Sequence, residues 1–543
     1  MRLSVYPFLR LVLPLLLGAG WLTLAAQGPV SLRSDVVVSR VTAAPANTVR
    51  IDKHPQTGEL YLLTEEGDLY RLDPQDRSTT LLFDSNDHGL QQTYGLEIGM
   101  TGNFYLAAAE QSNGFNVGKV AKGSPDGSGG YRWTLLAQTE PYRSSGNRDH
   151  QFNAIIESLD GQYVYVNSGS RTDHGEEARN DGRREMPLTA AILRIPVNAQ
   201  NLLLQNDVAF LTQNGYLYAD GVRNTYDLEY AANGHLFGIE NSDTRDNEEE
   251  LNWILPGKHY GFPWRIGTQM NPQQYPDFNP PQSDPLLIDG INMEGTFYND
   301  PTFPAIPAGL TFMEPVRNLG PDADVFRDSV DGQIKDASDL DRSIGTFTPH
   351  SSPVALAFDT EHQLGAPYTG VGFAMSYNAA SRRKYAPFLD PGEDLLMVEL
   401  TYSAADSNYT AQVTRLVENF GGPIDNVLLG HELYVVEYGS SGIWKVTFPA
   451  STQGLGSARQ SLGPVIQLFP NPARDHLALR SQNPEIQIEA ATLWTFQGQQ
   501  LTSLRPSSQG AWSADLSALP AGGYLVRVKT NRGTTLKRFT KSE

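Results

Sequence analysis

The sequence predicts an all-β protein, a six-bladed β-propeller followed by a small Ig-like β-sandwich domain. Three observations support this prediction. A strand–turn–strand pattern, with apolar residues at every second position, recurs six times between residues 35 and 450. The chain of 543 residues is rich in turn-forming and aromatic residues, with 50 Gly, 35 Pro, 24 Tyr and 22 Phe. A further block of short alternating strands begins near residue 465.

Each of the six units has an alternating strand, a polar turn and a second apolar strand. Gly58, Gly161 and Gly234 stand in three of the turns, where glycine accepts a positive φ at little cost. Six such units indicate six blades, with each hairpin forming the inner strands of its blade. The longest spacing, between the fourth and fifth units, predicts long loops on one face, where propellers bind ligands. The units are VRIDKHPQTGELYLLTE, YGLEIGMTGNFYLAAAE, NAIIESLDGQYVYVNSG, YDLEYAANGHLFGIENS, VALAFDTEHQLGAPYTGVGFAMS and IDNVLLGHELYVVEYGSSGIWKV.

The two ends of the chain carry different signals. Residues 1–26 combine Arg2 and Arg10 with the apolar run LVLPLLLGAGWLTLAA and small residues at its end, which predicts a secretory signal peptide. A membrane anchor is the alternative. Residues 451–464 (STQGLGSARQSLGP) predict a linker between the propeller, 35–450, and the C-terminal domain, 465–543.

The C-terminal block has four features in order. These are the turn Pro470-Asn471-Pro472, a central strand that ends at a glycine turn, the segment LPAGGYLVRV and a basic last strand. Together they resemble the C-terminal sorting domain of the type IX secretion system. The resemblance implies a partner, the type IX machinery, and a secreted or cell-surface location. A generic Ig-like sandwich is the alternative.

Composition excludes several function classes. The formal charge is −20, from 61 acidic and 41 basic residues, which argues against nucleic acid or an anionic membrane as a partner. The absence of cysteine excludes disulfides, thiolate zinc sites and cysteine nucleophiles. No G-x-S-x-G, H-E-x-x-H or P-loop motif occurs. With the signal peptide removed, we expect no membrane span in the mature form.

The segment from Asp220 to Trp264 carries most of the chemical information. It holds an Arg-Asn pair, a strand–turn–strand unit, an acidic loop and the aromatic turn YGFPW. It resembles the glucose/sorbosone dehydrogenases, the soluble sugar dehydrogenases that use pyrroloquinoline quinone (PQQ). The resemblance implies a propeller that oxidises a sugar hydroxyl, with PQQ and calcium as cofactors and a sugar or glycan as substrate.

The resemblance also assigns roles to individual residues. His150 matches the general base, a role that suits histidine because its unperturbed pKa lies near neutrality, and Asp149 matches its acidic neighbour at the cofactor. Arg223 and Asn224 match the pair that contacts the quinone and stabilises its reduced form. The remaining assignments are Glu240, Asn241 and Ser242 for calcium, and Arg383 and Lys384, with Arg382 as a neighbouring choice, for the cofactor.

The sixth unit departs from the family. Its entry, Gly421-Gly422-Pro423-Ile424-Asp425, lacks the arginines that would bind cofactor carboxylates. We therefore weigh two functions, a secreted PQQ-dependent aldose dehydrogenase and a non-catalytic propeller that binds glycans or proteins at the cell surface. Two charged segments also leave alternatives open. The run 243–250 predicts either a calcium loop or a solvated loop, and the Asp-rich segment 320–341 predicts a solvated or weakly calcium-binding insertion.

Overall fold

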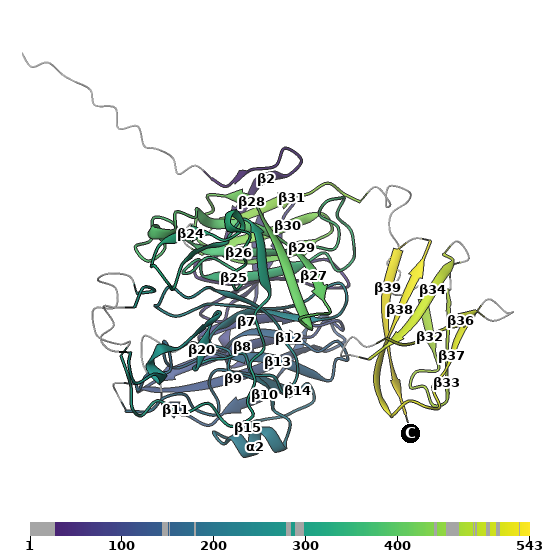
Figure 1. Cartoon of the computed structure of the whole chain (residues 1–543). Helices are drawn as coiled ribbons and strands as arrows, with labels where there is room; N and C mark the ends of the chain where they lie inside the picture. The colour runs from purple at the N-terminus through teal and green to yellow at the C-terminus, as the bar shows by residue number, and fades with distance from the viewer. Residues whose placement is uncertain are drawn as a thin grey trace, which may run out of the picture.

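The structure is a computed structural model with strands throughout and only short helices (Figure 1). It describes residues 28–143, 150, 152–178, 181–278, 284–287, 298–438 and 442–451, and in the C-terminal part 466–481, 483, 486–495, 500–506, 511–531 and 533–542. The predicted signal peptide, and the predicted linker apart from Ser451, lie outside these residues. Within the described part, no helix has the length and apolarity needed to cross a membrane.

Six antiparallel sheets follow one another along the chain, and each forms one blade. Blade one has β3 (Thr48–Lys53), β4 (Leu60–Thr64), β5 (Leu69–Asp73) and β6 (Ser78–Phe83). Blade two has β7 (Thr93–Ile98), β8 (Phe104–Ser112), β9 (Phe115–Pro125) and β10 (Tyr131–Thr139), edged by β11 (Tyr142–Arg143) and β15 (Leu202–Leu204). Blade three has β12 (Phe152–Glu157), β13 (Tyr163–Ser168), β14 (Ala191–Pro196) and β16 (Leu217–Asp220).

The second half of the propeller is less regular. Blade four has only three strands, β17 (Thr225–Tyr230), β18 (Leu236–Glu240) and β19 (Glu250–Trp253). Blade five has β25 (Pro353–Phe358), β26 (Gly372–Ala379), β27 (Gly392–Ser403) and β28 (Asn408–Glu418), edged by β1 (Val30–Ser31) and β22 (Arg317–Pro321). Blade six has β29 (Pro423–Leu429), β30 (Glu432–Glu437), β31 (Gly442–Thr447) and β2 (Val37–Ala43).

Short elements connect the blades. Two α-helices, α1 (Ser85–His88) and α2 (Val208–Gln213), lie on the outer side of blades one to three. The insertion between blades four and five contains β20 (Arg265–Ile266), β21 (Gln269–Met270), β23 (Val325–Arg327) and β24 (Ile334–Asp336). The 3-10 helices are η1 (Pro272–Gln274), η3 (Ser338–Leu340) and η4 (Ala386–Phe388).

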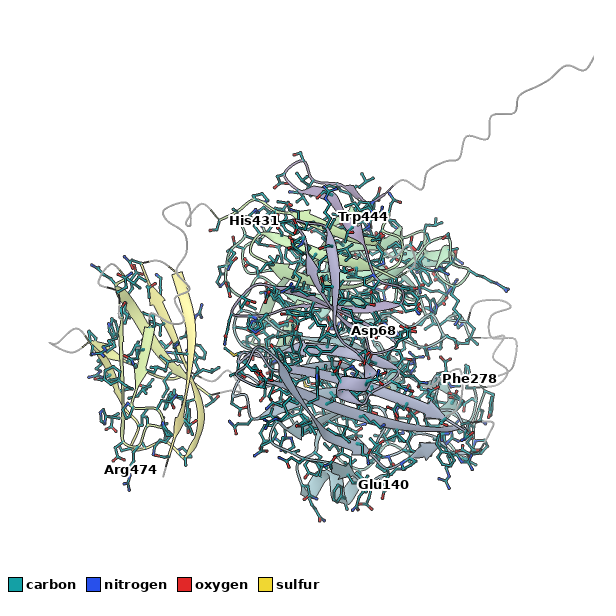
Figure 2. The ribbon with its side chains drawn as sticks, turned by 180° about the vertical axis from the view of Figure 1, so that it is seen from behind. Asp68, Glu140, Phe278, His431, Trp444 and Arg474 are labelled. Atoms are coloured by element: carbon teal, nitrogen blue, oxygen red, sulfur yellow. The ribbon has the colours of Figure 1, made fainter. Side chains whose placement is uncertain are left out.

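Two sets of contacts close the ring of blades. The innermost strands β3, β7, β12, β17, β25 and β29 pack beside one another in this order, and β29 packs beside β3. In blade six, β2 from the start of the propeller pairs with β31 from the end of the propeller, with Val37 opposite Thr447 and Ala43 opposite Gly442. Trp444 of β31 is labelled in Figure 2. The six-bladed architecture predicted from the six hairpins is therefore confirmed.

Carboxylates on the innermost strands tie neighbouring blades together. Each accepts a hydrogen bond from a backbone N–H on the innermost strand of the next blade. Because these strands belong to separate sheets, the carboxylates supply acceptors to donors that no ladder satisfies. The pairs are Asp52 with Ile98 at 2.6 Å, Asp227 with Leu356 at 2.8 Å and Asp425 with Ile51 at 2.8 Å.

Arg50 of β3 extends this arrangement across the propeller. It is 3% exposed and donates to the backbone carbonyls of Tyr94 at 2.7 Å and Tyr226 at 2.6 Å. Its guanidinium also lies 3.6 Å from the carboxylate of Asp425. One buried cation therefore connects blades one, two, four and six.

The C-terminal part is a separate pair of sheets. One sheet has β32 (Ile466–Phe469), β33 (His476–Ser481), β37 (Trp512–Asp515) and β36 (Arg505–Pro506). The other has β35 (Gln500–Ser503), β34 (Ile488–Trp494), β38 (Gly522–Thr530) and β39 (Gly533–Lys541). Leu477 and Leu479 of the first sheet share a core with Leu493 and Val526 of the second. The small predicted β-sandwich is therefore present.

The Asp-rich segment 320–341 is partly solvated, since Asp331, Asp339 and Asp341 are exposed. It forms the hairpin β23–β24, and the buried carboxylate of Asp328 is paired with cationic side chains. Asp328, which is 5% exposed, accepts from Lys335 at 2.8 Å and from Arg342 at 3.0 Å. Because cationic side chains occupy these oxygens, the segment acts as a self-paired structural insertion.

Candidate functional site

The predicted site residues of blades three and four gather at one end of the propeller. His150 precedes β12, and Arg223 and Asn224 precede β17. The partner strands β13 and β18 run antiparallel to these and therefore end at the same place. The loops that follow β13 and β18 thus lie against the starts of β12 and β17. Asp149 lies outside the described residues.

His150 is half-buried, and its ring nitrogen Nδ1 contacts Ser170. Its Nδ1 lies 3.0 Å from the backbone carbonyl of Ser170 and 3.0 Å from the hydroxyl oxygen of the same residue. A carbonyl can only accept, and the Ser170 hydroxyl already donates to the carbonyl of Thr172 at 2.8 Å. Nδ1 therefore carries the hydrogen, and in the neutral ring Nε2 is the nitrogen that can accept a proton.

Gly169 allows this contact. A Cβ at position 169 would lie 2.3 Å from the Cβ of His150, closer than two carbon atoms can approach. Ser170 continues the connection to blade four, because its N–H donates to the carbonyl of Arg223 at 2.7 Å. The structure thus joins His150 to Arg223 through a single residue.

Arg223 is buried, at 5% exposed, and its guanidinium is fixed by the loop after β13. It donates to the carbonyl of Asp173 at 2.8 Å, to the carboxylate of Asp173 at 2.9 Å and to the carbonyl of Asn241 at 3.0 Å. Asp173 is itself 4% exposed. Asp173 was not predicted from the sequence. It follows β13, the second strand of its hairpin, just as the loop at 240–242 lies at the end of β18, and this position is the signal that could have identified it.

Asn224 belongs to a chain of side-chain amides that crosses three blades. Each amide donates to the next acceptor, so the orientation of every member fixes that of its neighbours. The chain starts at the end of β13 and finishes on the backbone of β25. Its steps are Asn167 to Asn153 at 2.7 Å, Asn153 to Asn224 at 2.8 Å, Asn224 to Asn241 at 3.0 Å and Asn241 to the carbonyl of Pro353 at 2.7 Å.

The three residues predicted to bind calcium are already engaged. Both carboxylate oxygens of Glu240 accept hydrogen bonds, from the Arg223 N–H at 2.8 Å and the Thr225 hydroxyl at 3.1 Å. The Asn241 carbonyl accepts from a guanidinium, and the Ser242 hydroxyl donates to the carbonyl of Asn247 at 3.0 Å. The described residues contain no group of three or more carboxylates and histidines arranged for a metal. Because a cation already touches this set, it does not fit calcium.

The charged run 243–250 is buried throughout, so the solvated-loop alternative is wrong. Its groups are paired with partners elsewhere in the chain. Arg245 contacts Asp284 at 2.7 Å, and Asp246 accepts from His350 at 2.8 Å and from Arg327 at 2.5 Å. Burial raises the pKa of Glu249, another member of the run, to about 8.

Cations for an anionic cofactor are unevenly distributed around this end. Arg383 is exposed and Lys384 is half-buried, in the turn that follows β26 of blade five. On blade six, the segment just before β29 lies beside a carboxylate, since Glu437 accepts from the Gly421 N–H at 2.5 Å. Two buried arginines in the loops of blades three and four have carboxylate partners, namely Arg171 with Asp181 at 3.1 Å and Arg223 with Asp173 at 2.9 Å. Cationic side chains at this end therefore stand on blades four and five, whereas blade six presents an acid.

Comparisons with solved structures gave similarities at low sequence identity. The structure is similar to the PQQ domain of pyranose dehydrogenase from Coprinopsis cinerea in its holo form, at 14% identity and a TM-score of 0.47, over 77% of this chain and 97% of that one. It is also similar to a glucose dehydrogenase (16%, TM-score 0.47, 76% and 99%) and to the soluble aldose sugar dehydrogenase of Escherichia coli in the apo form (14%, TM-score 0.46, 76% and 99%). A search of curated proteins gave no match.

The C-terminal part gives a direct family match. Residues 467–542 match the family described as "Secretion system C-terminal sorting domain". These residues form the strands β32 to β39 of the sandwich. The chain therefore ends in a sorting domain of the type IX secretion system, which directs it to the cell surface or the medium.

Proposed function

We propose that the end of the propeller at His150, Arg223 and Asn224 oxidises a hydroxyl group of a sugar. The observation that carries the proposal is the Nδ1 contact between His150 and Ser170, which leaves Nε2 as the proton-accepting nitrogen. Ser170 also binds the backbone of Arg223, so the base and the buried cation are held in one network. Alcohol oxidation needs a base for the hydroxyl proton and a positive charge near the acceptor.

The residues of this chain divide the work as follows. His150 takes the hydroxyl proton at Nε2, and the carbon that bears the hydroxyl loses its hydrogen as hydride. Two electrons and one proton leave the carbon and one proton leaves the oxygen, so a carbonyl product forms. Arg223, held by Asp173, stabilises negative charge that develops on the acceptor, and Asn224 orients the acceptor through the amide chain.

The acceptor we propose is PQQ. When bound, it supplies a quinone that accepts the hydride. Arg223 and Asn224 would hold it on blade four, with Arg383 and Lys384 on blade five. The carboxylates of PQQ would lie away from Glu437 on blade six, because the Glu437 carboxylate repels an anion. No step of the proposal depends on calcium.

The proposal is tested by adding PQQ to the purified full-length chain and measuring dye-linked oxidation of a panel of aldoses. We expect turnover with at least one aldose, and a loss of roughly 10²- to 10⁴-fold in His150→Ala. His431→Ala is the matched control, since His431 is exposed and follows β29 at the opposite end (Figure 2). Turnover that is equal in wild type and His150→Ala, or absent with every aldose, would overturn the proposal.

A second candidate is a propeller that binds glycans or proteins at the cell surface without catalysis. The pairing of buried arginines with carboxylates, together with the acid on blade six, favours it. A tricarboxylate gains little from cations that are already neutralised. This candidate predicts no change in the absorbance of PQQ on mixing with the protein, whereas the dehydrogenase predicts one.

A further inference from the structure

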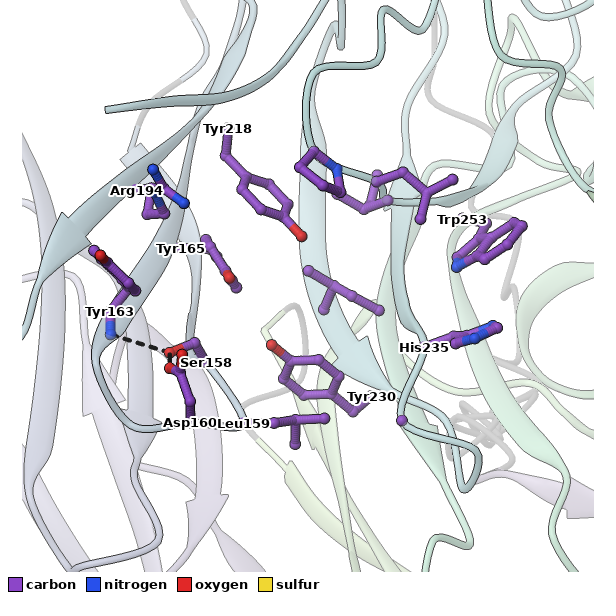
Figure 3. A pocket seen from close by; sticks show the side chains of 15 residues that line it. Ser158, Leu159, Asp160, Tyr163, Tyr165, Arg194, Tyr218, Tyr230, His235 and Trp253 are labelled. Carbon is purple, nitrogen blue, oxygen red and sulfur yellow. Dashed lines mark hydrogen bonds between the residues drawn. The ribbon is translucent and has the colours of Figure 1, made fainter. Parts of the chain in front are cut away.

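A cavity of about 170 Å³ lies between blades three and four, at the opposite end of the propeller from His150 (Figure 3). Ser158, which follows β12, and Gly234, in the turn between β17 and β18, both line it. Since β12 runs from the His150 end to Ser158, the strand separates the cavity from the proposed oxidation site. We propose that this cavity binds one pyranose ring of a neutral glycan. The inference does not depend on the proposed function.

The walls of the cavity are aromatic. Tyr165 of β13 and Tyr218 of β16 lie with ring centroids 4.2 Å apart and planes tilted by 32°. His235 and Trp253 stack at 4.7 Å with an angle of 19° on the blade-four side. Flat aromatic faces suit the C–H faces of a sugar ring, while the phenol and indole polar groups reach its edges.

The polar groups that face the cavity are mainly hydroxyls. Figure 3 shows the hydroxyl ends of Tyr218 and Tyr230 turned toward the same central space, from blades three and four respectively. Burial raises the pKa of Tyr165, Tyr218 and Tyr230 above the usual value for a phenol, so all three stay protonated and can both donate and accept. Sugar hydroxyls have the same double capacity.

Charge at the cavity is balanced, which argues for a neutral ligand. Arg194 covers the ring of Tyr163 at 4.7 Å and is fixed by a bond from Nε to the Gly215 carbonyl at 2.8 Å. Asp160 accepts from the Ser158 hydroxyl at 2.6 Å. One cation and one anion line the site, so neither an anionic nor a cationic ligand gains a net charge advantage.

The volume limits the ligand to one ring. A cavity of roughly 150 Å³ accommodates a benzene molecule, and drug-sized ligands need roughly 300 Å³ or more. A space of about 170 Å³ therefore holds one six-membered ring. Benzene itself is a poor match because hydroxyls and two charged groups line the walls. A pyranose ring, at the end of a chain or in a methyl glycoside, matches the polarity, with its substituents and the rest of the glycan lying outside the cavity.

The test is calorimetric titration of the full-length chain, without PQQ, with methyl glycosides of common hexopyranoses and with their short oligosaccharides. We expect saturable binding of at least one neutral pyranoside. Tyr218→Phe and Tyr230→Phe remove one hydroxyl each and should weaken Kd roughly five- to tenfold. Tyr402→Phe is the matched control, since Tyr402 is 50% exposed and does not line the cavity.

The outcomes separate this inference from the proposed oxidation. His150→Ala should bind the pyranoside as wild type does, and both Tyr→Phe variants should keep dye-linked activity. No saturable binding by any neutral pyranoside overturns the inference. So does binding that is unchanged in both Tyr→Phe variants but lost in His150→Ala, or binding restricted to sugar acids or amino sugars.

Discussion

Removal of the Asp173 carboxylate is expected to destabilise the propeller strongly. Asp173 is 4% exposed, and its carboxylate accepts from Arg223 at 2.9 Å and from the Thr244 hydroxyl at 2.5 Å. In Asp173→Ala the Arg223 guanidinium stays buried at 5% exposure without its counter-charge. Breaking a buried ion pair in this way costs about 3–5 kcal/mol.

A graded pair of variants tests the reason for the loss. Asp173→Asn keeps the shape and one acceptor oxygen but removes the charge, so we expect a loss of about 1.5–3 kcal/mol, the value of one hydrogen bond to a charged group. The matched control is Glu59→Ala, which breaks the exposed pair between Glu59 and Arg71 at 3.3 Å. Exposed pairs are worth about 0–1 kcal/mol.

The assay is urea denaturation of the full-length chain followed by tryptophan fluorescence, with the free energy of unfolding compared at equal denaturant slopes. Four tryptophans, Trp133, Trp253, Trp264 and Trp444, report on the propeller. If Asp173→Ala were within about 0.5 kcal/mol of wild type, the guanidinium would have found water or another partner. The description of Arg223 as a cation fixed by Asp173 would then be refuted.

Three further predictions follow from the same structure. Burial raises the pKa of Glu249 to about 8, whereas its ordinary pKa, which holds in the unfolded chain, is near 4.5. Between these two pH values the folded chain keeps a proton that the unfolded chain has released. The stability that this group contributes is therefore fully present below pH 4.5 and falls as the pH rises toward 8, by about 1.4 kcal/mol per unit of pKa shift. Melting curves at pH 5 and 8 should therefore differ less in Glu249→Gln than in wild type, and an equal difference would contradict the assignment. Asn153→Ala removes the acceptor of the Asn167 side-chain NH2 and the donor to the Asn224 side-chain oxygen, and it should cost about 1–3 kcal/mol for each orphaned group. Asn103→Ala, whose amide bonds an exposed threonine, should cost under about 1 kcal/mol in the same melts. A chain that ends at Ser451 should fold but remain inside the producing cell, as cell fractionation would show; export of the truncated chain would contradict the role of residues 467–542.

The overall fold could be predicted because it depends on local pattern. Period-two alternation marks each hairpin, and the turns at Gly58, Gly161 and Gly234 have φ of +74°, +61° and +84°, as expected for glycine in tight turns. Blade closure by β2 could not be predicted in this way, because the pairing of Val37 with Thr447 joins residues far apart in the sequence. Nothing local in VVSRVTA identifies its partner.

The site was only partly accessible from sequence. His150, Arg223 and Asn224 stand at strand starts and could be identified there, but their roles stay predictions. What the sequence hid is which charges neutralise one another. Asp173 and Arg223 meet because the loop after β13 lies against the start of β17. The run 243–250 is buried by chain from residue 284 and beyond. A run of charges is typical of a solvated loop unless its distant partners are known, which explains why the sequence alone leaves the solvated-loop alternative for 243–250 open.

Anaerobic single-turnover kinetics test the central claim most directly. The full-length chain is loaded with PQQ and mixed with an aldose, and quinone reduction is followed by its absorbance. We expect fast reduction in wild type and in His431→Ala, and reduction slower by roughly 10²- to 10⁴-fold in His150→Ala. Equal rates in wild type and His150→Ala would show that the nitrogen positioned by Ser170 does not take the proton, and would contradict the account.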